Sequence, residues 1–318
     1  MKKRILAVVA LVLMLVMALS SCGGARYAMG TGGTGGTYYA FGAVLGKQIE
    51  ASTNFGCVAV STDGSKANIL GIKQGTYQLG TVQSDVMAYA WQGTNTFAND
   101  GKIDSFRVIG GLYAEAVQLI TTNEEIKTVA DLKGKTVSIG AAGSGVYFNA
   151  IDVLTAAGIT LDDITPAYQS FNDSAESLKD GKIDAAFVVA GAPTPAVTDL
   201  AMTKTARLVP IDGEIADKIM ASCPYYTKYV VPAGTYNGQT EDVATITVKA
   251  TLIVSADLDE NTVYEMTKAI FDNIDAIKAV HAKGEELTIE NATNGMTAPF
   301  HKGAAKYFAE QGVIVTAE

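Results

Sequence analysis

The stretch RYAMGTGGTGGTYYAFG, Arg26 to Gly42, leads from an extended run, through a turn of glycines and threonines, into a helical pattern. Gly30, Gly32 and Gly35 stand in the spacing G-x-G-x-x-G, which is the outline of a dinucleotide-binding turn. A glycine-rich turn at a helix start also lets the backbone approach other small ligands closely. The stretch therefore predicts a strand–turn–helix unit and leaves the ligand open.

The N-terminus indicates where the protein works. After the cations of MKKR, residues 5–19 form an unbroken apolar run of 15 residues, which is short for a membrane span and typical of a signal-peptide core. The following LSSC, ending at Cys22, resembles the lipobox of bacterial lipoproteins, whose cysteine is acylated; an ordinary secretory signal is the alternative. We expect loss of residues 1–21 and a lipid anchor on the outer face of the cytoplasmic membrane. NAD is not available there as a cofactor.

The composition favours a small-solute protein over a nucleic-acid binder. The 318 residues carry a net charge of −9, which becomes −12 when the three cations of MKKR leave with the signal, and no basic stripe follows. Such an acidic chain is a poor partner for polyanions. The remaining 297 residues are enough for two lobes with their own cores. Cys57 and Cys223 can form one disulfide in an oxidising compartment or stay as two buried thiols.

Short strands alternate with helices along the chain, which predicts α/β structure with mostly parallel sheets. Two strand-rich stretches, residues 112–122 and 245–256, bracket the middle third. We interpret them as paired crossover strands between two lobes. The first lobe would then comprise residues 22–115 and 251–318, and the second lobe residues 116–250, with a ligand cleft between them.

Small residues recur wherever a strand is expected to lead into a helix. In an open α/β sheet such turns lie at the carboxyl ends of the strands, where ligands bind. Each helix start offers unpaired backbone N–H groups and a partial positive charge. One such turn is equally typical of ordinary helix capping, but their recurrence in both lobes predicts a shared site for a small anion. The turns lie at residues 32–36, 63–65, 83–85, 143–145 and 191–195.

A series of landmarks follows in order along the chain. They are GTGGTGGTYYAFG, TDGSKANI, VQSDVMAYAWQG, DLKGKTVSIGAAGSG, GKIDAAFVVAG with PTPAVTDLA, PAGTYNGQTEDVATITVKATLIV and PFHKGAAKYF. Together they resemble the TAXI family, the extracytoplasmic solute receptors of TRAP transporters, over nearly the whole mature chain. The resemblance implies a two-lobed type II periplasmic-binding-protein fold that closes around a small carboxylate, such as glutamate or 2-oxoglutarate. It also implies delivery of the solute to a fused, ion-gradient-driven membrane permease.

The resemblance further implies a set of ligand-binding residues. Val146 departs from the family pattern, which often has Thr at this place, and a lost hydroxyl alters which solute fits. Lys66 is expected either to face solvent or to meet a second carboxylate. Asp85 is expected either to accept a hydrogen bond from a ligand ammonium or to stabilise the helix dipole. The implied site comprises Thr34, Gly36, Thr37, Tyr38, Ser65, Gln83, Ser84, Asp85, Ser144, Gly145, Val146, Ala192 and Pro193.

The sequence lacks the signatures of an enzyme. Ser65 and Ser144 follow glycines, but neither completes G-x-S-x-G. No G-x-x-x-x-G-K-[ST] occurs, and His281 and His301, the only histidines, lack further ligands at zinc spacing. We therefore expect no enzymatic activity, no cofactor, no metal and no nucleic-acid partner.

The residues and the TAXI resemblance together predict a lipid-anchored receptor; the resemblance implies that it captures a small carboxylate for a TRAP-type permease. Two alternatives stay open. One is a sensory or adaptor module of the same fold that presents its ligand to a membrane kinase. The other is an anchored hydrolase that turns over an ester or amide.

Overall fold

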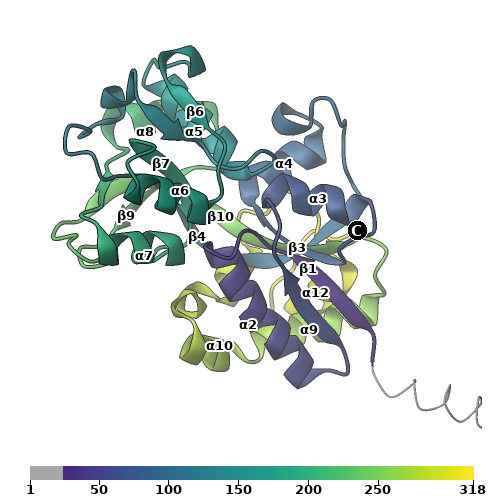
Figure 1. Cartoon of the computed structure of the whole chain (residues 1–318). Coiled ribbons are helices and arrows are strands. Elements are labelled where there is room, and N and C mark those ends of the chain that lie inside the picture. The colour runs from purple at the N-terminus through teal and green to yellow at the C-terminus, as the bar shows by residue number, and fades with distance from the viewer. Residues whose placement is uncertain (1–23) are drawn as a thin grey trace, which may run out of the picture.

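The computed structural model describes residues 24–318, so the expected signal peptide and Cys22 lie outside the described residues. The chain forms two α/β lobes joined by two long strands (Figure 1). One lobe is built from both ends of the described chain, and the other from its middle. Within residues 24–318, no helix is both long enough and apolar enough to span a membrane.

The first lobe, purple to blue and yellow in Figure 1, begins with strand–helix units and ends with a run of helices. Its first helix buries Phe41, Leu45 and Ile49, one residue per turn, so one face packs on the sheet. The elements are β1 (Arg26–Gly30), α2 (Thr37–Ser52), β2 (Gly56–Val60), α3 (Ser65–Lys73), β3 (Leu79–Gln83), α4 (Ser84–Gln92), η1 (Asn95–Phe97), α9 (Glu260–Phe271), α10 (Ile274–Val280), η4 (Ala282–Glu286), α11 (Ile289–Thr293) and α12 (Lys302–Glu310).

In the second lobe, side chains of strand β7 (Ala185–Ala190) alternate between two hydrophobic cores. Phe187 and Val189 belong to one core, and Val188 and Ala190 to the other, as the two-residue period of a strand requires. The strand is therefore buried on both faces. The elements are η2 (Val129–Leu132), β5 (Thr136–Ser138), α5 (Gly145–Ala156), η3 (Leu161–Asp163), β6 (Thr165–Ala167), α6 (Phe171–Lys179), β7 (Ala185–Ala190), α7 (Pro195–Thr203), β8 (Arg207–Val209), α8 (Gly213–Ser222) and β9 (Thr227–Val231).

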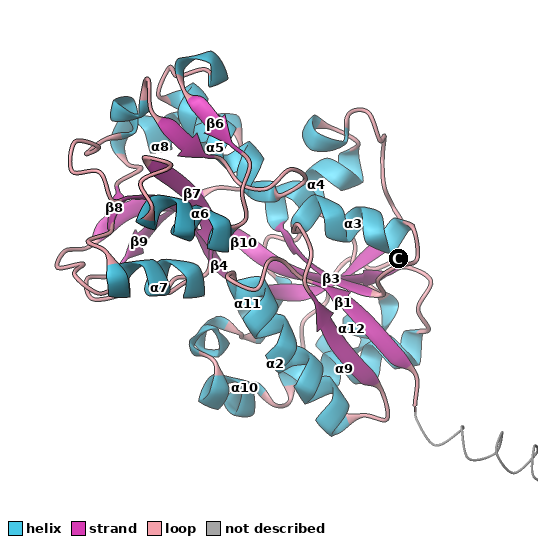
Figure 2. Cartoon of the chain, viewed as in Figure 1, coloured by secondary structure: helices cyan, strands magenta, loops and turns pink. Residues whose placement is uncertain are grey.

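Two long strands cross from one lobe to the other (Figure 2). They are β4 (Phe106–Thr121) and β10 (Val243–Ser255), which pair antiparallel from Phe106 opposite Ser255 to Ala116 opposite Thr247. They overlap the two stretches that the sequence predicted to pair. The expected lobe boundaries, after residues 115 and 250, fall inside these two strands. The exact boundaries remain a prediction.

The sheet is mixed, which corrects the expectation of mostly parallel sheets. The strand order is β2-β1-β3-β10-β4-β7-β5-β6, with β8 paired to β4 and β9 paired to β10. Strands β1 to β3 pair in parallel, and so do β5 to β7. The crossover strands pair antiparallel with all their neighbours. β4 leaves the first lobe and β10 returns to it, so these two strands run in opposite directions.

The two cysteines of the described chain are free thiols. Cys57 is buried in the core of the first lobe and Cys223 in a core of the second lobe. Burial raises the pKa of the Cys57 thiol to about 12. Of the two alternatives that the sequence left open, the structure has the pair of buried thiols.

Candidate ligand-binding site

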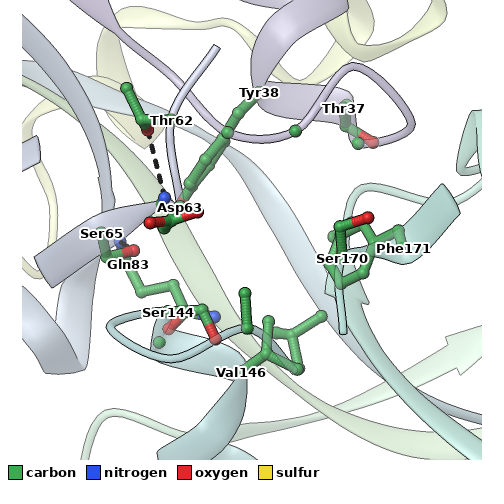
Figure 3. Close-up of a pocket in the computed structure, with 18 of the residues that line it drawn as sticks. Thr37, Tyr38, Thr62, Asp63, Ser65, Gln83, Ser144, Val146, Ser170 and Phe171 are labelled. Atoms are coloured by element: carbon green, nitrogen blue, oxygen red, sulfur yellow. Dashed lines mark hydrogen bonds between the residues drawn. The ribbon is translucent and has the colours of Figure 1, made fainter. Parts of the chain in front are cut away.

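A cavity of about 80 Å³ lies between the two lobes. Its wall is formed where strands of both lobes end, the usual place for a ligand in an α/β sheet. At roughly 10–15 Å³ per water, it can hold on the order of five to eight waters, or a small solute of similar size. Tyr38, Thr62 and Ser65 of the first lobe face Ser144 and Phe171 of the second (Figure 3). The wall comprises Gly32, Gly33, Gly36, Thr37, Tyr38, Thr62, Asp63, Gly64, Ser65, Gln83, Glu115, Ala141, Ser144, Gly145, Val146, Gln169, Ser170, Phe171, Val189 and Ala190.

Five helices begin at this wall. They are α2, α3, α4, α5 and α6, whose N-cap residues are Gly36, Gly64, Gln83, Ser144 and Ser170. The first N–H groups of a helix lack partners within it, and its N-terminus carries a partial positive charge. Gly64 has a φ of 103°, a conformation that glycine adopts without strain. Ser144 Oγ accepts a hydrogen bond from the Tyr147 backbone N at 3.3 Å, so this hydroxyl caps α5 at the wall. The arrangement suits an anion.

The charged side chains of the wall are both acidic. Among the wall residues that the structure describes, these are Asp63 and Glu115, and none is Lys, Arg or His. Asp63 is exposed, whereas Glu115 is only 1% exposed. Tyr38 Oη donates a hydrogen bond to Glu115 Oε2 at 3.0 Å. Burial raises the pKa of the Glu115 carboxyl well above its usual range, although the hydrogen bond from Tyr38 opposes this shift.

A buried lysine close to Glu115 already has an anionic partner. Lys283 Nζ lies 2.6 Å from Glu286 Oε1, and the lysine side chain is 7% exposed. Glu286 Oε2 also accepts a hydrogen bond from the Ala114 backbone N at 2.6 Å. The Lys283 ammonium lowers the pKa of Glu115, but less than the hydrogen bond from Tyr38 does. The ion pair is neutral as a whole and does not supply Glu115 with a counter-ion of its own.

Buried polar side chains join the two lobes beside the cavity. Asn149 Nδ2 of α5 donates to Asp85 Oδ2 at 3.0 Å and to Tyr226 Oη at 2.6 Å, and Tyr226 Oη donates to Asp152 Oδ2 at 2.8 Å. Because the Asn149 nitrogen serves these two acceptors, its Oδ1 accepts from Gln83 Nε2, at 2.9 Å. Gln83 Oε1 is then a buried acceptor without a partner in residues 24–318.

Asp85→Asn is expected to flatten the pH dependence of stability between about pH 4 and pH 7. Burial raises the pKa of Asp85 to about 7, so the folded protein holds this proton more tightly than the unfolded chain does. Stability therefore falls as the pH rises from about 4 to about 7, by a few kcal/mol at most. Asn149 can still donate to the amide oxygen of the variant.

Urea unfolding at a series of pH values measures this effect. Glu115 and Asp152 have pKa values shifted in the same direction, and both are present in wild type and variant. The difference between the two profiles therefore isolates Asp85. Asp199→Asn, on the exposed face of α7, is the matched control and should follow the wild type. Parallel profiles for wild type and Asp85→Asn would contradict the prediction.

The lobes also meet at the mouth of the cavity. Thr37 Oγ1 of α2 donates to the Gly191 backbone O at 2.7 Å. The backbone N of Ala196, in α7, donates to the Gly35 backbone O at 3.1 Å. These contacts link the first glycine turn to the segment after β7, so the structure is that of a closed molecule.

The structure brings part of the implied site together. On the cavity wall lie Gly36, Thr37, Tyr38, Ser65, Gln83, Ser144, Gly145 and Val146. Off the wall lie Thr34, which borders a neighbouring surface hollow, Ser84 and Asp85, which are buried in α4, Ala192, which is buried, and Pro193, which is exposed. Lys66 lies off the wall, and its Nζ pairs with a carboxylate of the protein, Asp100 Oδ2, at 2.9 Å.

Several wall residues were missed by sequence reasoning. Glu115 had a signal, because it is a single carboxylate within the otherwise uncharged stretch LYAEAVQL. Ser170 also had one, since it stands three residues before Asp173 in the pattern of a helix start, and its Oγ accepts from the Asp173 backbone N at 3.2 Å. Phe171 and Gln169 had none, because their contact with the cavity depends on how the lobes meet.

The fold and its cavity define a two-lobed molecule of the periplasmic-binding-protein class. Within this class the chain belongs to the NMT1-like family, whose model matches residues 29–312.

Solved structures share the fold at low sequence identity. The alkanesulfonate-binding protein SsuA from Xanthomonas axonopodis pv. citri, bound to MOPS, has a TM-score of 0.50 and 16% identity, and the match covers 90% of each chain. An ancestral arginine-binding protein bound to arginine has a TM-score of 0.51 and 14% identity, over 82% of this chain and 97% of that one.

Proposed function

We propose that the protein is an extracytoplasmic receptor that captures a small carboxylate between its lobes and delivers it to a membrane permease. The observation that carries this proposal is the start of five helices, α2 to α6, at one cavity. Free backbone N–H groups at helix starts donate charge-assisted hydrogen bonds to carboxylate oxygens. A wall without basic side chains among the described residues leaves this task to the backbone and the hydroxyls.

The size of the cavity and the similar structures support a small polar solute. A space of about 80 Å³ suits a small solute. The similar structures include one bound to MOPS and one bound to arginine, both small charged molecules. Of the family ligands that the sequence resemblance implies, glutamate and 2-oxoglutarate are the probes to use first.

Capture works by closure of the two lobes. A solute favours the closed state only by binding it better than the open one. Contacts that close the mouth, such as Thr37 to Gly191, form only when the lobes meet. The permease would recognise the closed shape and release the solute by opening it.

The transporter class and the anchor rest on sequence landmarks. The ordered TAXI landmarks support a TRAP-type permease, and LSSC supports acylation of Cys22, outside the described residues. Solute uptake by vesicles that carry receptor and permease should respond to an ion gradient; uptake that requires ATP, or binding without uptake, would contradict the TRAP assignment. Fatty-acid labelling should tag the wild type and not Cys22→Ala.

Ser144→Asp is expected to weaken binding of glutamate or 2-oxoglutarate at least tenfold. The new charge at the N-cap of α5 repels a ligand carboxylate, and a lost charge-assisted hydrogen bond alone costs about 1.5–3 kcal/mol. Aspartate is a good N-cap and can keep the bond to Tyr147, so unliganded stability should stay within about 1 kcal/mol. Titration calorimetry measures the affinity.

The control repeats the change at an exposed cap off the cavity wall. Thr288 caps α11 and accepts from the Asn291 backbone N at 3.0 Å. Thr288→Asp should bind as the wild type does. If Ser144→Asp also binds as the wild type does, Ser144 is a cap only and the helix starts do not hold the carboxylate.

A further inference from the structure

We propose that Glu115 accepts the ammonium group of the solute, which makes the preferred ligand a small zwitterion of the α-amino acid type. This inference deepens the proposed function and rests on it. One of the two roles expected for Asp85 from the sequence was to accept a hydrogen bond from a ligand ammonium. The inference gives this role to Glu115 instead.

The Asp85 carboxylate does not face the cavity, because it takes part in the buried network between the lobes. The side chain is 0% exposed and lies off the cavity wall. Asp85 Oδ2 accepts from Asn149, and both residues belong to the buried network between the lobes. Glu115, by contrast, is a wall residue from the crossover strand β4. The ammonium of a bound solute would therefore meet Glu115.

The formal charges around the cavity are unbalanced. Glu115 is buried, and its neighbours Tyr38 and Gln83 are neutral donors. Lys283 is held by Glu286 at 2.6 Å. A buried carboxylate is costly unless a cation pairs with it. In the empty protein a proton on Glu115 removes the charge, and a ligand ammonium can take the place of that proton.

The wall carries both donors and acceptors, as a zwitterion requires. The helix starts at Gly36, Gly64 and Ser144 offer N–H donors for a carboxylate. Glu115 offers carboxylate oxygens, and Gln83 has an amide oxygen without a partner in the described chain. A purely anionic solute uses only the donors. An amino acid uses both sets, because its carboxylate accepts from the N–H donors and its ammonium donates to the oxygens.

The inference predicts a preference between solutes that differ in one group. L-glutamate and 2-oxoglutarate share a skeleton and differ in ammonium versus keto oxygen, and L-alanine and pyruvate form a second pair. The wild type should bind the amino acid of at least one pair tenfold or more tightly than its keto acid, measured by calorimetry. Ethylamine, which lacks the carboxylate, completes the panel.

Glu115→Gln tests the role of the residue. Glutamine has nearly the same shape and can still accept from Tyr38, but it has no charge for an ammonium. Amino-acid affinity should fall about tenfold to hundredfold, as for a lost charge-assisted hydrogen bond, and keto-acid affinity should change little. Glu50→Gln, on the exposed side of α2, removes the same charge away from the cavity and should bind as the wild type does.

A second measurement needs no variant. If the proton on Glu115 gives way to an ammonium, binding of an amino acid near pH 6 should release protons, and binding of a keto acid should not. Calorimetry in two buffers of different ionisation enthalpy reports this release. A melting curve shows whether Glu115→Gln folds. If it does not fold, proton release by the wild type still tests whether a ligand ammonium replaces the proton on Glu115.

The outcomes separate this inference from the proposed function. Loss of the amino-acid preference in Glu115→Gln, or proton release specific to amino acids, supports the role of Glu115. Keto acids that bind as tightly as amino acids, with no proton release, would overturn it and leave the carboxylate receptor standing. Binding of ethylamine alone, weakened in Glu115→Gln, would support Glu115 as the ammonium site but overturn both the zwitterion preference and the carboxylate receptor. A panel with no binding at all would overturn both.

Discussion

Replacing Gly145 by alanine is expected to weaken solute binding about a hundredfold and to leave the unliganded protein nearly as stable as before. Gly145 is the first residue of α5 in the second lobe. A Cβ at this position would lie 1.6 Å from Gln83 Oε1 and 3.0 Å from Val86 Cγ2, both in the first lobe. Gln83 cannot move aside freely, because its amide nitrogen donates to Asn149.

The cost of the methyl group falls on the closed state. Either the lobes stay apart, or Gln83 breaks a buried hydrogen bond. Overpacking costs about 1–3 kcal/mol and a lost buried hydrogen bond about as much. A penalty of roughly 3 kcal/mol on the binding-competent state lowers the affinity about a hundredfold. The open protein has no such clash, and alanine is the better helix former.

Gly46→Ala is the contrasting variant. Its Cβ would lie 2.5 Å from the Cys57 backbone O, within the first lobe. This change should lower the melting temperature, and the protein that remains folded should bind normally. Calorimetry and thermal unfolding on both variants separate closure from stability. Wild-type affinity in Gly145→Ala, or a loss of stability as large as that of Gly46→Ala, would contradict the closure argument.

Asn149→Ala is expected to lower the free energy of unfolding by roughly 3 kcal/mol, because three buried partners lose a hydrogen bond at once. Gln83, Asp85 and Tyr226 all bond to this one amide, which is 0% exposed. A buried polar group without its partner costs about 1–3 kcal/mol, and the costs are not fully additive. For a chain of this size the melting temperature should fall by roughly 5–10 °C.

Asn172→Ala provides the control, since Asn172 also bridges the lobes but does so at the surface. Its Nδ2 donates to Thr34 Oγ1 at 3.2 Å in an exposed position. Water can replace this partner, so the expected change is within about 0.5 kcal/mol. Scanning calorimetry at pH 7 compares the two variants. Equal losses would mean that the buried network contributes no more than the surface bridge.

The fold could be predicted from the sequence where the signals are local. A strand followed by a glycine turn and a helix, as in residues 26–42, can be predicted from one short continuous stretch. The sequence did not predict that β4 and β10 pair antiparallel with their neighbours and so make the sheet mixed. Strand direction there depends on where the chain re-enters the first lobe, more than 120 residues later, and no short stretch encodes that.

The same distinction applies to the site. Ser65 and Ser144 could be placed at a ligand wall because each begins a helix, which is a local property. Glu115 stands out in the sequence as a single carboxylate in an uncharged stretch, but its place on the cavity wall depends on how the lobes meet. Asp85 has the residue type that an ammonium needs, but its carboxylate is turned toward Asn149 by packing across the lobe boundary.

The place of β10 in the sheet sets the order in which the two lobes can complete their strands during synthesis. β3 and β4 follow each other in the chain, yet β10 lies between them and pairs with both. Until residues 243–255 have emerged, the first lobe has two open strand edges, whereas the strands β5 to β8 of the second lobe are already available to β4. Open edges recruit other chains. A nascent chain halted before residue 243 would therefore be prone to aggregation, and the first lobe completes its sheet only after the second lobe has been synthesised.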